Sequence, residues 1–415
     1  MRYHLIYLWV LVLLVGVIDW LLWRLCNKEK PLSGLRKWLG IIGFGVSPVV
    51  FLIGFFIFGL LVPEASGYQV YNAFSGFLTL FLLIYLPKLV FLLVYGIGML
   101  PAAIPRKAAK KPKRHYPRIT RAKFLSQIGI IMATAPFVTL LFGVLKGRFA
   151  FYTHHVKLSF PNLPEAFDGL RIVQISDLHL GSFGTNRKPL KEAVELINAE
   201  NPDIVLFTGD LVNNFAGEIR NWEEVFGQLK AGIGKYAILG NHDYGDYSTW
   251  PSQQRKEANF KSILSGYRRL GFKLLRNESV TLEKGGQKIA ISGVENWGHP
   301  PFPQYGDLEK TWNKVGDAPF KILMSHDPDH WDAEVVGKKN YDITLAGHTH
   351  GMQFGVALGN FNWSPAQYKF KRWAGLYQVG KQLLYVNRGL GYLGMPARVG
   401  MPPEITVFKL KRDSA

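Results

Sequence analysis

Five short apolar runs in the second half of the chain are each followed by side chains that commonly bind metal ions. The runs have the pattern of buried strands and cover Arg171–Ser176, Asp203–Thr208, Tyr236–Leu239, Lys321–Ser325 and Asp342–Ala346. The side chains that follow them are Asp177 and His179, Asp210, Asn241 and His242, His326, and His348 and His350. Because groups at the carboxyl ends of strands in an α/β sheet converge on one crevice, we expect these side chains to meet.

This set of side chains favours a particular metal chemistry. Carboxylate, imidazole and amide ligands suit Mn, Fe or Zn better than Ca, which prefers shells made only of oxygen. Two such cations about 3.5–4 Å apart can activate water as hydroxide and hold both the attacking and the leaving oxygen of a displacement. A carboxylate shared between the cations reduces their repulsion. The pattern therefore predicts hydrolysis of a phosphate ester.

Strands and helices alternate around these motifs. Helical patterns cover Lys188–Ala199, Trp222–Lys230 and Gln253–Leu270, and further strands are expected at Gln287–Gly293, Leu383–Asn387 and Ile405–Leu410. This order predicts a layered α/β or α+β domain over residues 151–415. His299 and His330 lie outside the motifs, and we interpret them as structural residues.

Residues 1–150 have the composition of a membrane anchor. A bilayer core needs about 20 apolar residues per helix, and the candidate spans are 5–23, 39–62, 74–100 and 125–145. The third span contains Pro87 and is predicted to be one kinked helix. Asp19 and Lys88 are predicted to form an internal ion pair or to lie at helix ends, and an ion path is the alternative. The single cysteine, Cys26, excludes an intrachain disulfide.

The net charge of +19 lies mainly in this first part of the chain. Residues 1–150 hold 18 Lys and Arg against 3 Asp and Glu, whereas the rest holds 31 against 27. Basic residues among apolar segments set membrane orientation and contact anionic lipid, so no nucleic-acid partner is expected. The loops Arg24–Trp38 and 101–124 are basic, and Pro63–Ala73 has no Lys or Arg. These loops predict a multi-pass protein of the inner or plasma membrane with its C-terminal domain on the extracytoplasmic face.

In their order along the chain, the motifs resemble those of the calcineurin-like metallophosphoesterases. The matching residues are Asp177-Leu178-His179, Gly209-Asp210, Gly240-Asn241-His242-Asp243, His326 and Gly347-His348-Thr349-His350. The segments 163–170 and 387–391 are similar to the membrane-associated branch of that family. This branch includes transmembrane metallophosphoesterases and UDP-2,3-diacylglucosamine pyrophosphatase-like enzymes of lipid A synthesis.

The resemblance implies an α+β fold, in which N-terminal transmembrane helices precede a double β-sheet sandwich flanked by helices. It also implies a dinuclear metal centre with a metal-bound hydroxide as the nucleophile. One cation would be held by Asp177, His179 and His350, the other by Asn241, His326 and His348, and both by a bridging Asp210. His242 would stabilise the transition state or protonate the leaving oxygen, a role that contributes about 10²–10⁴-fold. Arg388 would contact a substrate phosphate.

Two positions depart from the family pattern. Asn213 stands where many relatives have an Asp that supports the catalytic histidine. Its amide oxygen is expected to accept a hydrogen bond from His242 without supplying a negative charge. Met352 stands where relatives of this branch often have Gly, next to the proposed ligands but not among them.

The loops near the motifs are rich in aromatic residues. Trp363 and Trp373 follow the last motif and are interleaved with Lys369, Lys371 and Arg372, as in an interfacial surface. Either this rim faces the bilayer and admits a lipid-linked phosphate ester, or the aromatics pack a long loop. Diester or pyrophosphate cleavage is favoured over monoester cleavage. The alternatives are a lipid A precursor pyrophosphatase, which the expected topology disfavours, and a non-catalytic metal-binding regulator on a membrane module.

Overall fold

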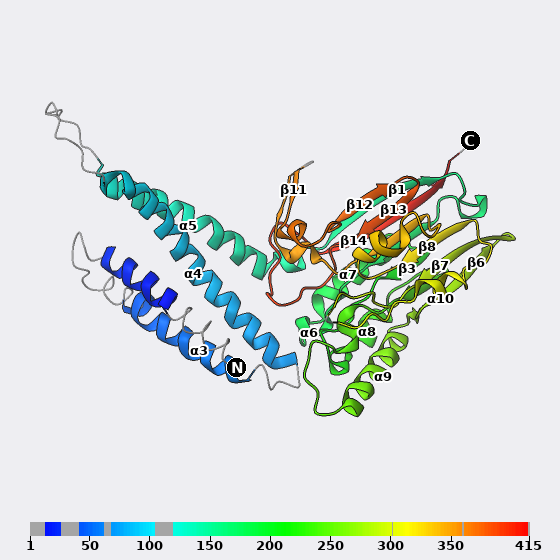
Figure 1. The fold of residues 1–415 in the computed structure, drawn as a ribbon, viewed down its shortest axis with the longest axis horizontal. Coiled ribbons are helices and arrows are strands. Elements are labelled where there is room, and N and C mark those ends of the chain that lie inside the picture. Colours follow the sequence, from blue (N-terminus) through cyan, green and yellow to red (C-terminus); the bar gives the residue numbers. More distant parts are fainter. Residues whose placement is uncertain are drawn as a thin grey trace. The chain divides into compact units, whose positions relative to one another are not determined.

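The chain folds as two compact units, shown in Figure 1. The computed structural model describes residues 13–25, 41–61, 68–103, 119–300, 302–358 and 361–413. The first unit lies within Met1–Glu64 and Ala73–Phe142, and the second within Ala65–Asn72 and Gly143–Ala415.

The first unit is helical because its sequence is a succession of long apolar runs. Residues 13–25 are helical, and the remaining elements are the π-helical turn Ile41–Val46, α3 (Ser47–Leu61), α4 (Tyr68–Ala103) and α5 (Arg121–Leu145). Two helices, Gln69–Leu100 and Arg121–Phe149, are long and apolar enough to cross a membrane, and a shorter apolar helix covers Gly43–Gly59. α4 runs through Pro87 as one helix. The expected span 5–23 and the basic loop 101–124 lie partly outside the described residues.

An ion pair lies inside this helical unit. Lys88 Nζ is 2.7 Å from Asp19 Oδ1 and donates to Gly43 O at 2.8 Å. Tyr85 Oη donates to Asp19 Oδ2 at 2.7 Å, and Asp19 is only 2% exposed. The predicted internal pair is therefore confirmed. Its hydrogen bonds offset the large cost of placing an isolated charge among apolar helices.

The second unit contains two six-stranded sheets and a small hairpin. The first sheet has the order β1 (Tyr152–Phe160), β14 (Glu404–Arg412), β2 (Arg171–Ile175), β3 (Ile204–Phe207), β4 (Gly234–Ala237) and β5 (Lys273–Leu274). The second has the order β12 (Gly375–Val379), β13 (Gln382–Val386), β9 (Ile343–Ala346), β8 (Phe320–Met324), β7 (Gln287–Gly293) and β6 (Glu278–Lys284). The hairpin is β10 (Val356–Leu358) with β11 (Phe361–Trp363).

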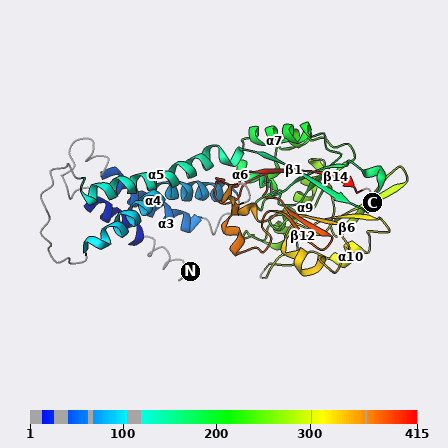
Figure 2. The same cartoon turned by 90° about the horizontal axis from the view of Figure 1, so that it is seen from above.

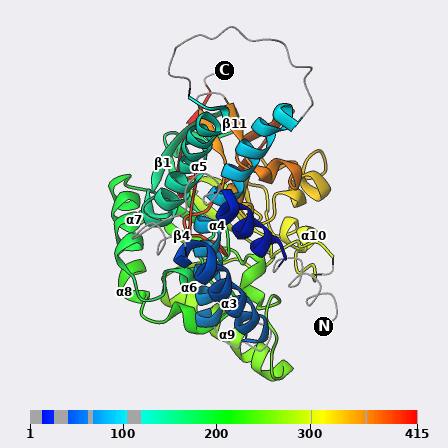
Figure 3. The same ribbon diagram turned by 90° about the vertical axis from the view of Figure 1, so that its left-hand side faces the viewer.

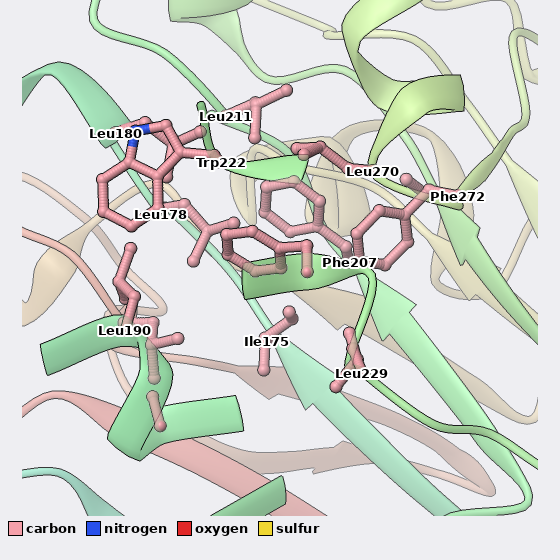
Figure 4. Close-up of a cluster of buried hydrophobic side chains, with 14 of the residues drawn as sticks. Ile175, Leu178, Leu180, Leu190, Phe207, Leu211, Trp222, Leu229, Leu270 and Phe272 are labelled. Atoms are coloured by element: carbon pink, nitrogen blue, oxygen red, sulfur yellow. The ribbon is translucent and has the colours of Figure 1, made fainter. Parts of the chain in front are cut away.

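The two sheets pack face to face and carry helices on their outer faces. Alternate residues of each strand point to opposite faces, so Ile172 of β2 joins the core shared with β8 and β9, whereas Val173 joins the core under the helices. Figure 4 shows this outer core, in which Phe207 of β3 lies near Leu270 and Phe272. The fold is the expected α+β sandwich flanked by helices.

The helices on the first sheet are α7 (Lys188–Ala199), α8 (Glu223–Phe226) and α9 (Gln253–Arg269), and α10 (Leu308–Trp312) belongs to the second sheet. Figure 2 and Figure 3 show α7 and α10 on opposite sides of the sandwich. The helix expected over Trp222–Lys230 is wrong in length, because it ends where Gly227 follows α8. Glycine is a poor helix former.

The motif-bearing loops follow parallel strands. β2, β3 and β4 are parallel neighbours in the first sheet, as are β8 and β9 in the second. Gln174 Nε2 donates to Ala346 O at 2.9 Å and so ties the two sheets together near the ends of these strands. The carboxyl ends of both sheets therefore deliver their loops to one place.

Candidate metal centre

The motif loops are joined by hydrogen bonds where the two sheets meet. Asp177 N donates to Gly209 O at 2.9 Å in the first sheet, and Gly347 N donates to His326 O at 3.0 Å in the second. His348 N lies 3.1 Å and 3.2 Å from the two carboxylate oxygens of Asp177 and links the sheets. Residues that are more than 100 positions apart in sequence are therefore held side by side.

Five of the seven predicted ligands have a left-handed backbone, which costs a non-glycine residue about 1–3 kcal/mol. The φ angles are 52° at Asp177, 45° at His179, 60° at Asp210, 72° at His348 and 51° at His350. Such strain persists only where the surrounding structure imposes it, and it gathers at functional sites. Met352 also has a positive φ of 48°, a conformation that glycine adopts without strain.

Asp177, His179 and His350 form one cluster of ligand atoms. His350 Nε2 lies 3.3 Å from Asp177 Oδ1 and 3.1 Å from His179 Nε2. The three side chains are buried, and one ligand atom from each lies within 4.8 Å of the others. Since bonds from such ligands to a cation are about 2.0–2.2 Å long, the three atoms are spaced to surround one cation.

The remaining predicted ligands form a second cluster beside the first. Asn241 Oδ1 lies 2.9 Å from His326 Nε2 and 2.8 Å from His348 Nδ1. Asp210 Oδ2 lies 3.3 Å from His326 Nε2 and 3.5 Å from His179 Nε2, between the two clusters. The structure thus brings all seven predicted ligands together, and their donor atoms fit a pair of cations.

The electrostatics of the cluster suit cation binding. Burial lowers the pKa of His179 to about 3, so its imidazole is neutral at neutral pH. Burial opposes ionisation of Asp177 and Asp210, but the imidazoles of His350 and His326 offset it and hold both carboxyl pKa values below their usual range. Burial also disfavours protonated His326, yet the Asp210 carboxylate raises the His326 pKa to about 10. A cation bound there would displace this proton.

His242 lies beside the cation ligands. Its Nδ1 is 2.7 Å from the backbone oxygen of Asn213, and its backbone N–H donates to Asp210 Oδ1 at 2.9 Å. The Asn213 amide nitrogen instead donates to Ser182 Oγ at 3.3 Å. The expected contact of the Asn213 amide oxygen with His242 is therefore wrong, because the main chain supplies the acceptor. Tyr247 stacks on the His242 ring with 4.4 Å between centroids.

Two arginines lie near the centre in different roles. Arg388 Nε is 3.0 Å from Oε2 of the buried Glu404, so a substrate phosphate would have to compete with that carboxylate. Arg398 is buried, and its Nη2 lies 3.3 Å from His350 Nδ1 and donates to Gly389 O at 3.1 Å. Burial lowers the Arg398 pKa to about 9. Arg398 packs behind a proposed ligand, although no local motif marks it in the sequence.

Two buried carboxylates that are not among the predicted site residues shape the ligand loops. Asp243 accepts hydrogen bonds from Tyr267 Oη at 2.7 Å and, at 2.9–3.3 Å, from the backbone N–H groups of Asp210, Leu211, Val212 and Gly240. Glu218 accepts, at 2.6–3.1 Å, from the backbone N–H groups of Gly181, Asn213, Asn214 and Phe215. Burial raises the pKa of each carboxyl to about 7, and Asp210 adds to the shift at Asp243.

The two histidines outside the motifs differ from each other. His330 is buried between Ser325 Oγ at 2.8 Å and Glu334 Oε2 at 3.0 Å, a structural role as expected. His299 is half exposed, and its Nε2 lies 3.0 Å from Asp329 Oδ2 and 3.7 Å from Asp327 Oδ2. One ligand atom from each of His299, Asp327 and Asp329 lies within 4.8 Å of the others. All three line a pocket together with the proposed ligands Asn241 and His348.

Comparison with known proteins defines the class of this chain. The family model "Calcineurin-like phosphoesterase" matches residues 170–352, and "Probable Calcineurin-like phosphoesterase, transmembrane domain" matches residues 1–148. The uncharacterised metallophosphoesterase YkuE of Bacillus subtilis is 36% identical over 266 residues, which cover 62% of this chain and 84% of YkuE. The chain belongs to the calcineurin-like metallophosphoesterase family, and it is a hydrolase of phosphate-ester bonds.

Two further relatives extend the similarity. The transmembrane protein with metallophosphoesterase domain of Danio rerio is 28% identical over 340 residues, which cover 79% of this chain and 72% of that protein. The UDP-2,3-diacylglucosamine pyrophosphatase LpxG of Chlamydia trachomatis is 31% identical over 298 residues, which cover 60% of this chain and 86% of LpxG. With the family match over residues 1–148, the transmembrane relative identifies a membrane protein.

Proposed function

We propose that this chain hydrolyses a phosphodiester, pyrophosphate or phosphomonoester bond at a centre of two divalent cations, Mn, Fe or Zn. The observation that supports this most is the position of Asp210 Oδ2, 3.5 Å from His179 Nε2 and 3.3 Å from His326 Nε2. A carboxylate between two groups of ligands is suited to bridge two cations. One cation would be held by Asp177, His179 and His350, and the other by Asn241, His326 and His348.

The bound cations would supply an activated water and offset the charge of the phosphoryl group. In the hydrolysis, water gives up a proton to solvent, its oxygen forms the new bond to phosphorus, and the bond from phosphorus to the ester oxygen breaks. His242 is placed to give that leaving oxygen a proton from its imidazolium form, because Nδ1–H donates to the Asn213 carbonyl and the second proton is carried by Nε2. The chain contributes a buried, preorganised set of ligands and the orientation of this ring.

Assays of the full-length protein with Mn²⁺ and bis-p-nitrophenyl phosphate test this proposal. Asp210→Asn should abolish turnover and reduce metal content, whereas His242→Ala should reduce turnover and leave the metal in place. A wild-type protein that binds two metal equivalents but cleaves no ester would favour the metal-binding regulator instead. The 31% identity to LpxG favours a pyrophosphatase as the second candidate, which UDP-2,3-diacylglucosamine would test directly.

We further propose that residues 1–150 form the membrane anchor, with spans at 5–23, 39–62, 74–100 and 125–145, and that residues 151–415 form the phosphoesterase domain. The family match over residues 1–148 supports this boundary. The basic loops favour the cytoplasm, which places the phosphoesterase domain on the extracytoplasmic face. A reporter protein fused after Phe151 should report the outer side, and a cytoplasmic signal would overturn this topology.

We also propose that the substrate is lipid-linked and enters along the aromatic rim around Trp363 and Trp373. Tyr368 of this run is 79% exposed, whereas Phe370 is buried and packs beside His348. Replacing both tryptophans by Ala should impair hydrolysis of lipid phosphodiesters and spare bis-p-nitrophenyl phosphate. Equal losses on the two substrates would support ordinary loop packing.

A further inference from the structure

A pocket of about 410 Å³ opens beside the metal centre, and most of the residues that line it have no role in the hydrolytic step described above. Asn241 and His348, both proposed cation ligands, line it, so the pocket is continuous with the centre. Its other walls include residues of the loop after β7 and of the loop after β8. A group attached to a phosphate at the cations would therefore reach it.

One part of the lining consists of hydrogen-bond acceptors. Asp327 is 2% exposed and lies with Asp329 next to the single imidazole of His299. Asn296 is also 2% exposed, and its amide oxygen has no hydrogen-bond partner among the residues that the structure describes. A buried acceptor without a partner is unfavourable, so this oxygen is suited to a donor from a ligand.

Another part of the lining is aromatic. Tyr247 and Phe302 lie with their ring centroids 4.5 Å apart, and Tyr247 accepts a hydrogen bond from Asn241 Nδ2 at 2.9 Å. Phe370 lies 5.4 Å from the His348 ring. Aromatic rings together with carboxylates attract organic cations. Lys369 also lines the pocket and is exposed, with its Nζ 4.9 Å from the Phe370 centroid.

We propose that this pocket binds a primary ammonium group on one alcohol of the phosphodiester, so that the substrate is a phosphoethanolamine-type ester. Asp327, Asp329 and Asn296 would accept the N–H groups, and the aromatic rings would line the short carbon chain. A quaternary ammonium fits less well because these oxygens require donors. The pocket is also far larger than one metal ion, although His299 and the two carboxylates could ligate one. The inference rests on the proposed phosphoesterase activity.

Three p-nitrophenyl phosphodiesters test the inference on the full-length protein with Mn²⁺. Their second alcohol is ethanolamine, ethanol or choline. The ethanolamine ester should have a kcat/KM about tenfold or more above the ethanol ester, equivalent to one charged hydrogen-bonded contact. Equal values for these two esters, or a faster choline ester, would overturn the inference. Cleavage of none of the three would instead overturn the proposed function.

Variants locate the recognition in the pocket. Asp329→Asn should reduce the preference for the ethanolamine ester, whereas Asp332→Asn should keep it, because Asp332 pairs outside the pocket with Lys371 and Arg372. The ratio of the two esters is the readout, since a general structural loss lowers both rates. An unchanged ratio in Asp329→Asn would contradict the assignment.

Three measurements complete the test. Calorimetric binding of O-phosphoethanolamine should be tighter than that of ethyl phosphate, and equal affinities would overturn the inference without any assay of turnover. If elemental analysis finds a third metal equivalent in the wild type that is missing in Asp329→Asn, then Asp327 and Asp329 bind a cation and the inference is overturned. Hydrolysis rates of glycerophosphoethanolamine and of phosphatidylethanolamine vesicles distinguish a soluble substrate from a lipid substrate. Each rate is compared with that of the corresponding glycerol ester. If neither ethanolamine ester is cleaved faster than its glycerol ester, the proposal is contradicted.

Discussion

Replacing Asp243 by Asn changes one oxygen into an amide nitrogen where the loops after β3 and β4 are tied together. Asp243 is fully buried, and its Oδ1 accepts from the backbone N–H groups of Leu211 and Val212 at 3.0 Å and 3.3 Å. Asn has nearly the same volume, so the substitution leaves no cavity. If the amide nitrogen takes the Oδ1 position, both N–H groups lose their acceptor.

The expected loss follows from these two contacts. At a pH above the Asp243 pKa of about 7 this carboxyl is ionised. Hydrogen bonds to charged groups are worth about 1.5–3 kcal/mol each, so the folded domain should then lose about 3–6 kcal/mol. A domain of this size loses roughly 2–4 °C in Tm per kcal/mol, which gives a decrease on the order of 10 °C. Metal content should fall as well, because Leu211 directly follows the proposed ligand Asp210, and the remaining oxygen would hold the backbone N–H groups of Asp210 and Gly240 without a negative charge.

Thermal melting and elemental analysis of the full-length protein in detergent measure both effects. Asp342→Asn is the matched control, since this carboxylate accepts from Lys321 N at 2.7 Å and Asn162 Nδ2 at 2.8 Å, just before β9 begins and away from the ligand loops. The control should lose less stability and keep its metal. If Asp243→Asn melts within about 2 °C of the wild type with full metal content, the reasoning is refuted.

Three further predictions follow from single contacts. His242→Ala should lower turnover about 10²–10⁴-fold. Asn213→Ala should keep near-wild-type turnover, because only the backbone oxygen of Asn213 contacts the His242 ring. Equal losses of turnover in the two variants, measured by steady-state kinetics, would contradict this. Burial raises the Glu218 pKa from 4.5 to about 7, so the folded state binds that proton more tightly and stability should decline as pH rises from 4.5 to about 7. Melting curves of Glu218→Gln should lack this decline. Asp19→Asn leaves the Lys88 charge without its partner and should destabilise the helical unit by about 3–5 kcal/mol. Melting in detergent should show that the double variant with Lys88→Met recovers this stability.

The sequence alone was sufficient to identify the chemistry of this chain. Carboxylates and imidazoles at strand ends mark a metal site because the geometry of parallel strands brings those ends together wherever the rest of the domain lies. The ion pair of Asp19 and Lys88 was predictable for a similar reason, since an isolated charge in an apolar span requires a partner. In both cases the side-chain type and its local setting carried the information.

Only the tertiary structure decided how the centre is held. The His242 ring is oriented by the backbone carbonyl of residue 213, and a backbone group is the same whatever side chain the position carries. Asp243 binds backbone N–H groups more than 30 positions away, and Arg398 lies behind His350 from a distant loop. The Asn296 amide oxygen lacks a hydrogen-bond partner within the described part of the chain, and this too depends on its surroundings. Sequence patterns report local periodicity and residue type, whereas these contacts depend on which distant segments the two sheets bring within hydrogen-bond distance.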